Sequence, residues 1–172
     1  MKLTEICPTE KWVAFEQHIH DISGLDANVF NTEGIRITNH KIWVNRLCPA
    51  IKATDKGQSF ICAVAHMNIA AQAMQTREPV IEECDAGLIK LVAPIFYNDE
   101  FIGAVGACGL LADDGEVDTF LINKTTDLEE SLIESLAGDI QTISREKAEA
   151  LARHIQEEIQ NMLSQPLAGN PV

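Results

Sequence analysis

The sequence predicts an α+β fold, in which an antiparallel β-sheet is covered by helices. Two almost continuously apolar runs, Leu88 to Tyr97 and Phe101 to Leu111, are separated by a short polar turn. Runs of this length and composition indicate adjacent central strands that are covered on both faces. Segments with helical spacing of their apolar residues precede and follow them. The chain has 172 residues, which fits one domain of ordinary size.

The N-terminal segment has the pattern of an amphipathic helix followed by a β-hairpin. Thr9 can cap the helix and Gly24 can end it. The apolar residues of this helix recur every three or four positions: Trp12, Phe15, Ile19 and Ile22. Residues 27–30 and 35–38 then flank a loop in which Gly34 can supply the positive φ of a hairpin turn. We therefore expect a helix and then two paired strands.

A short helix and a long helix are expected before the two apolar runs. Leu47 and Ile51 have helical spacing, but Pro49 between them lacks an amide hydrogen, so a helix there must be short. The segment Gln58 to Gln75 is rich in Ala, Met and Ile and favours a longer helix. On that helix Cys62 and His66 are one turn apart and share a face.

The C-terminal part of the sequence predicts two more helices. Asp127 and Glu130 form a capping-box-like start for a helix with these apolar positions: Leu128, Leu132, Leu136, Ile140 and Ile143. Ser144 can cap a last helix, in which residues Ala148 to Met162 form an apolar seam of barely two heptads. We expect residues 1–143 to form the main domain, 144–164 to form a signalling or dimerisation helix, and 165–172 to be a flexible tail.

Composition excludes several classes of function. Lys and Arg total 13 against 26 for Asp and Glu, so the net charge is −13, which would repel nucleic acids and anionic membranes. No apolar run is long enough to cross a bilayer, and the first residues are too polar for a secretory signal. We expect a cytoplasmic protein with no nucleic-acid or membrane partner. A nucleophile elbow, a phosphate-binding glycine loop and a two-histidine zinc motif are all missing from the sequence.

Cysteines are the residues with the most chemistry to offer. The chain has five, an odd number without an export signal, which favours thiols or ligands over disulfides. Cys48, Cys62 and Cys84, with Cys108 or His66 as a fourth ligand, could hold zinc or an iron–sulfur cluster if the fold brings them together. An inert buried thiol is the alternative for each of these cysteines. Residues 103–109 are unusually small for a strand, which would let a ligand come close.

Several motifs in the middle of the chain belong together: Leu47-Cys48-Pro49-Ala50-Ile51, Cys62, Glu78-Pro79-Val80-Ile81-Glu82-Glu83-Cys84-Asp85-Ala86-Gly87-Leu88, Ala93-Pro94-Ile95 and Ile102-Gly103. With these motifs the chain resembles the PocR ligand-binding sensor domain over about residues 10 to 145. It implies a PAS- and GAF-like fold and the sensing of small organic molecules. Asp85 and Cys108-Gly109 depart from the usual family residues, His and Gly-Gln, so the ligand itself is not implied.

Three hypotheses follow from these observations. The first is a non-catalytic sensor that binds a small organic ligand or a cysteine-held metal and relays binding through its terminal helices to a downstream signalling protein. Its expected binding residues are Trp43, Cys48, Cys62, His66, Cys84 and Cys108. The second is a GAF-like thiol redox enzyme of the methionine-sulfoxide-reductase type, which requires a thiolate of low pKa and a resolving thiol. The third is an adaptor that forms homodimers through the C-terminal seam.

Overall fold

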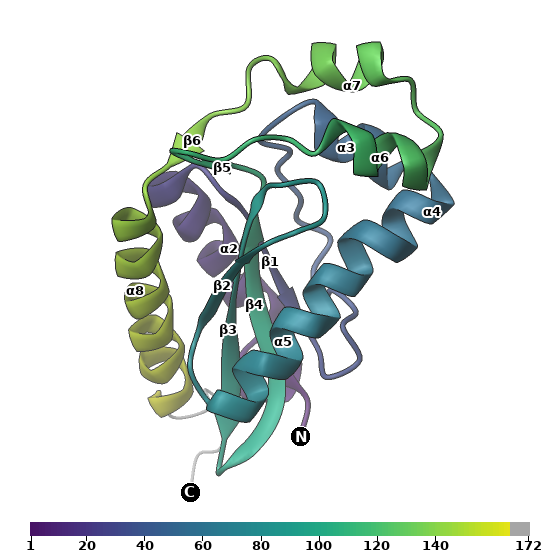
Figure 1. Cartoon of the computed structure of the whole chain (residues 1–172). Coiled ribbons are helices and arrows are strands. Elements are labelled where there is room, and N and C mark those ends of the chain that lie inside the picture. Colours follow the sequence, from purple (N-terminus) through teal and green to yellow (C-terminus); the bar gives the residue numbers. More distant parts are fainter. Residues whose placement is uncertain (166–172) are drawn as a thin grey trace, which may run out of the picture.

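The computed structural model describes residues 1–165, and the remainder of the predicted tail, 166–172, lies outside the described residues. A four-stranded antiparallel sheet with the order β1-β4-β3-β2 forms its centre. The strands are β1 (Asp26–Phe30), β2 (Val80–Glu83), β3 (Ile89–Tyr97) and β4 (Glu100–Cys108). Helix α5 (Val64–Thr76) crosses one face, and α2 (Thr9–Ser23) and α8 (Arg145–Ser164) cover the other (Figure 1). The predicted α+β architecture is confirmed.

Strand register decides which side chains face each helical layer. Cys108 is paired with Asp26 on one side and with Lys90 on the other, so these three residues form one row across the sheet. Successive residues of a strand point to opposite faces. The next row, Ala27, Ala107 and Leu91, therefore faces the opposite side and belongs to the core under α2 and α8. The α5 face thus carries polar groups, whereas the other face is apolar.

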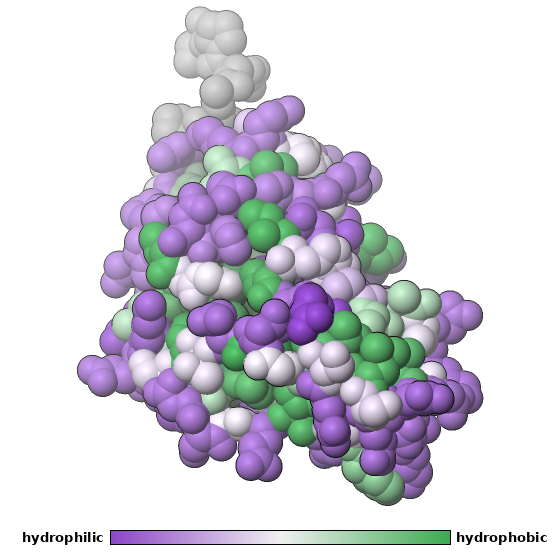
Figure 2. Space-filling model, turned by 90° about the horizontal axis from the view of Figure 1, so that it is seen from above, coloured by the Kyte–Doolittle hydropathy of each residue, from purple (hydrophilic) through white to green (hydrophobic). Residues whose placement is uncertain are grey.

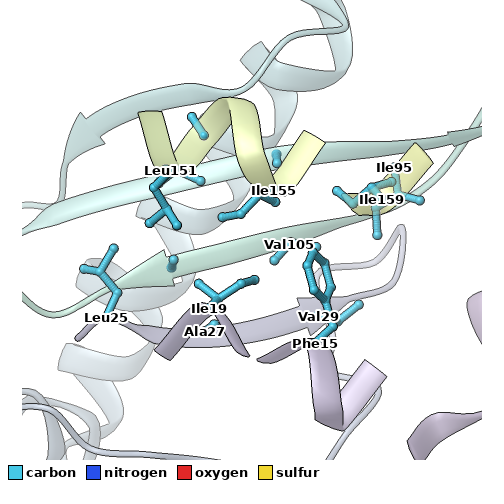
Figure 3. Packing of buried hydrophobic residues seen from close by; sticks show 14 of the residues in the cluster. Phe15, Ile19, Leu25, Ala27, Val29, Ile95, Val105, Leu151, Ile155 and Ile159 are labelled. Carbon is cyan, nitrogen blue, oxygen red and sulfur yellow. The ribbon is translucent and has the colours of Figure 1, made fainter. Parts of the chain in front are cut away.

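The α2 and α8 face contains the main hydrophobic core, together with α1 (Leu3–Ile6). Figure 3 shows Ile155 and Ile159 of α8 over the strands that Ile19 of α2 also covers. Ile155 and Ile19 are fully buried. The predicted C-terminal helix is confirmed, with the Ser144 hydroxyl accepting a hydrogen bond from the Lys147 amide as its N-cap. The apolar seam of this helix packs against the sheet of the same chain. The surface that a dimer would need is therefore already removed from water.

The N-terminal hairpin prediction was wrong in its second strand. β1 forms, but its ladder partner is β4, and residues 31–46 return as a loop with one isolated bridge, Phe30 to Arg36. The physical reason is side-chain bonding across the expected strand: the Arg36 guanidinium donates to Asn28 and the Thr38 hydroxyl donates to the buried Glu16 carboxylate. The first bond holds the loop to β1 and the second holds it to α2, while the backbone contributes only the two hydrogen bonds of the bridge, from the Ile37 amide to the Val29 carbonyl and from the Asn31 amide to the Ile35 carbonyl. The helix before it ends at Gly24 with φ of 75°, as the sequence predicts.

The long helix is confirmed and contains an irregular turn. Residues Asp55–Gly57 (α4), Gln58–Ala63 (η1, a π-helix) and Val64–Thr76 (α5) follow one another without a break. A π-helical turn widens the backbone, and such turns are frequent at functional sites. Cys62 lies in it. The short helix α3 (Leu47–Lys52) precedes it, in agreement with the limit that Pro49 imposes.

The helix predicted from Leu128 to Ile143 was wrong in extent. The structure has α6 (Thr119–Thr126), α7 (Glu130–Ala137) and a small parallel pair formed by β5 (Leu111–Ala112) and β6 (Thr142–Ile143). Ile143 is drawn out of the helix because it pairs with Ala112. Figure 2 shows this end of the molecule, where hydrophobic patches lie among hydrophilic side chains. Within residues 1–165, no helix combines the length and hydrophobicity needed to span a membrane.

Candidate functional site

A cavity of about 190 Å³ lies between the α5 face of the sheet, the loop 31–46 and the start of the long helix. All six residues predicted from the sequence to bind a ligand line it: Trp43, Cys48, Cys62, His66, Cys84 and Cys108. They come from segments far apart in the sequence. The fold therefore brings the cysteines around one enclosed space, with Cys7 left in the core under α2 and α8.

Different elements position the cavity cysteines. Cys62 and His66 project from the same face of the long helix, and Cys108 stands at the end of β4. The Asn45 side chain joins two walls, because its amide donates to the Gly109 carbonyl over 2.7 Å and its oxygen accepts from the Cys48 amide over 2.7 Å. The loop directly after β2 supplies the fourth thiol, Cys84.

The wall formed by the loop 31–46 is held by buried charges. The Glu16 carboxylate accepts hydrogen bonds from the Val29 amide and the Thr38 hydroxyl. Burial raises the pKa of Glu16, and these hydrogen bonds oppose that rise. Farther along the loop, Lys41 forms an ion pair with Asp26 of β1. The loop that carries Trp43 is therefore fixed at two points to the same edge strand.

Three of the cavity thiols, Cys48, Cys62 and Cys84, are protonated at neutral pH. Burial, together with the neighbouring Cys108, raises the pKa of Cys48 to about 12. Burial also raises the pKa of Cys62 and of Cys84, although Lys52 opposes the effect at Cys62 and hydrogen bonds oppose it at Cys84. A redox enzyme needs a thiolate, and hence a lowered pKa. This environment therefore disfavours the redox hypothesis. All five thiols are free.

The predicted metal site is not formed. Within residues 1–165, no three His, Cys, Asp or Glu side chains are grouped so that they could hold one metal ion. Cys48, Cys62, Cys84 and Cys108 all line the cavity and lie close enough to act on the pKa of Cys48, but they are not grouped as ligands of one metal ion. A tetrahedral zinc or cluster site requires each sulfur within about 2.3 Å of the metal. The geometry fits a ligand that occupies the space itself.

His66 is a neutral base inside the cavity. Burial, together with the positive charges of Lys90 and Lys52, lowers its pKa to about 3. The ring stacks on Phe30, with 3.8 Å between centroids, and its buried Nδ1 atom has no hydrogen-bond partner among the described residues. A buried polar atom without a partner is uncommon in proteins. His66 can therefore donate to or accept from a molecule in the cavity.

The sequence interpretation missed the charged residues of this site. Lys41, Lys52 and Lys90 all line the cavity, as do Asp26 and Phe30. Lys90 is the single charged residue in an otherwise apolar strand run. Because lysine is rarely buried, this charge indicated that one face of the strand borders a polar site. Asp26 is the equivalent charge in β1, only 3% exposed. Neither residue belongs to a motif.

An antiparallel sheet with a cavity enclosed between one face and its covering helices defines a class of α+β domains that can hold a small ligand. The family model described as the sensory domain found in PocR matches residues 5–166, so the chain belongs to this family of sensory domains. No curated protein and no solved structure matches the chain.

Proposed function

We propose that this sensory domain binds a small organic molecule in the cavity between α5 and the loop 31–46. The observation that carries the proposal is the cavity itself, about 190 Å³ in volume and lined by residues from several segments between Asp26 and Gly109. An apolar cavity of about 150 Å³ holds benzene. The available space thus suits a ligand of about six to nine non-hydrogen atoms.

Ligand binding is relayed, in this proposal, through β3 to α8. Lys90 lines the cavity, while its neighbours Ile89 and Leu91 belong to the core on the α8 side. A ligand that holds β3 in one position favours one packing of α8, and it acts only through a difference in affinity between the two packings. The exposed acidic residues of α8 would then present the signal to a downstream protein.

Filling the cavity tests the binding proposal. Ala63 lines it, whereas the adjacent Val64 is 40% exposed and does not. Ala63→Phe should abolish ligand binding, and the matched control Val64→Phe should keep it. The measurement is titration calorimetry with a library of acids, alcohols and amides of three to seven carbons, with urea unfolding to verify that each variant is folded. If wild-type protein binds no member of the library, or a folded Ala63→Phe variant binds equally well, the proposal fails.

Amide hydrogen exchange tests the relay separately. A library member that binds should slow exchange in the loop 31–46 and change it in α8. Unchanged exchange in α8 at saturating ligand would refute the relay while leaving ligand binding intact.

A further inference from the structure

Three lysines surround a cavity whose remaining walls are mostly apolar. Lys90 projects from β3 and is only 9% exposed, Lys52 projects from the end of α3, and Lys41 projects from the loop 31–46. All three charges act on Cys62, whose pKa they lower against the larger effect of burial. The three ammonium groups therefore approach the same part of the cavity.

Two of these lysines lack a counter-charge. Lys41 is paired with Asp26, but none of the four ion pairs within residues 1–165 includes Lys52 or Lys90. The remaining acid of the cavity wall, Glu33, is exposed. Burial of a charge without a partner is costly. The low pKa of Lys52, caused first by burial and then by Lys41, reflects this cost.

The unpartnered Nδ1 of His66 lies beside one of these lysines. A Cβ added to Gly106 of β4 would stand 3.6 Å from His66 Nδ1 and 3.6 Å from Lys90 Nζ. Both polar atoms therefore stand above the bare backbone of Gly106. The Phe30 ring reaches the same point, with Cε2 3.1 Å from the added Cβ. His66, Lys90 and Phe30 all line the cavity, so this part of its wall combines two polar groups with an aromatic ring.

The rest of the wall suits an uncharged group. Phe30, Trp43 and Leu88 contribute apolar surface, and the cysteine side chains contribute soft, weakly polar surface. Lys41 lies over the Trp43 ring at 4.4 Å and Lys90 over the Phe30 ring at 5.6 Å, so each aromatic group borders a charge. A molecule with one anionic end and one apolar end matches this division.

We propose that the ligand is a small organic carboxylate whose anionic group sits between Lys90, Lys52 and His66. This inference rests on the proposed function and names the chemical class of its ligand. Two ammonium groups serve the two carboxylate oxygens, and neutral His66 donates from Nδ1. A singly charged group fits better than a phosphate, because none of the arginines within residues 1–165 lines the cavity to bind three anionic oxygens.

Matched pairs of acids and primary amides test the class of ligand. The acid and the amide have nearly the same shape, but only the acid is charged at neutral pH. Butyrate, hexanoate and benzoate are titrated against butyramide, hexanamide and benzamide by calorimetry. We expect at least one acid to bind at least about tenfold more tightly than its amide, as a hydrogen bond between charged groups would provide.

Charge removal tests the residues. Lys90→Met and Lys52→Met keep the aliphatic stem and should each weaken acid binding at least about tenfold. Lys56→Met is the control, because Lys56 is exposed and pairs with Asp127 outside the cavity. Without ligand, Lys90→Met should raise the midpoint of urea unfolding, since it removes a buried unpaired charge. A merely structural lysine would lower this midpoint when removed.

Each outcome decides between the proposals. An amide that binds as tightly as its acid, or an unchanged acid affinity in Lys90→Met, overturns the carboxylate inference and leaves the sensory proposal standing. If no acid binds but an alcohol of the library does, the inference also fails alone. If nothing in the library binds to wild-type protein, the sensory proposal fails, and the inference fails with it.

Discussion

Replacement of His66 by phenylalanine should remove a pH dependence from the stability of the protein. Phenylalanine keeps an aromatic ring against Phe30, whose centroid lies 3.8 Å from that of His66. No hydrogen bond is lost, since His66 Nδ1 has no partner among the described residues. The variant is therefore expected to fold, and the difference from wild type reports the titration of one buried imidazole.

The size of the effect follows from the pKa of His66, which burial lowers from 6.5 to about 3. Between these two values the unfolded chain binds a proton that the folded chain does not. Stability is therefore complete above the unfolded pKa and is lost as the pH falls below it. Each pH unit corresponds to about 1.4 kcal/mol, so about 2–3 kcal/mol is lost between about pH 6.5 and pH 4.5.

Urea unfolding of both proteins across this range measures the difference. The unfolding free energy of His66→Phe minus that of wild type should rise by about 2–3 kcal/mol from about pH 7 to pH 4.5. Taking the difference removes the contributions of groups common to both proteins, including Glu16. Val64→Phe, which adds a ring at an exposed neighbouring position, should follow wild type. Parallel pH curves for His66→Phe and wild type would refute the assignment of a neutral buried His66.

Two other predictions concern the core and the thiols. Ile155→Ala should reduce the unfolding free energy by about 2–4 kcal/mol, because it removes a fully buried side chain between α8 and the sheet, whereas the exposed Glu157→Ala control should change it by less than about 0.5 kcal/mol. An unfolding midpoint of wild type that rises with protein concentration would contradict the burial of this seam within one chain. Cys48, with its pKa raised from 9.0 to about 12, should react with iodoacetamide about a thousandfold more slowly in the folded protein than in urea. Equal rates in peptide mass mapping would contradict its protonated, buried state.

The cysteines could be found from the sequence because they are chemically distinctive. Few residue types bind ligands through sulfur, and Cys48, Cys62 and Cys84 also belong to the motifs of the family resemblance. The lysines could not be found in this way, because lysine is normally a surface residue and a single charge forms no pattern. Only the strand register, which pairs Lys90 with Cys108 and brings it near His66, shows that Lys90 belongs to the cavity.

The C-terminal seam illustrates the same limit. Its helical periodicity correctly predicted a helix with one apolar face, but periodicity does not say which surface covers that face. In the structure the sheet covers it, and the helix predicted just before it stops early because Ile143 joins a strand. A local sequence pattern predicts local conformation. Which surface covers an apolar face is decided by contacts between segments that are far apart in the sequence.

From the sequence alone followed the α+β class, the first, the long and the last helix, the antiparallel pairing of the two apolar runs, and the identity of the sulfur and imidazole groups. These properties depend on neighbouring residues, whose spacing and propensities are printed in the chain. The tertiary structure alone decided that β1 pairs with β4, that α8 covers the sheet, and that three lysines surround the cavity without enough carboxylates to match them. These arrangements depend on which distant segments bury the most apolar area when they pack together. A local sequence pattern contains no information on how alternative packings compare in this respect.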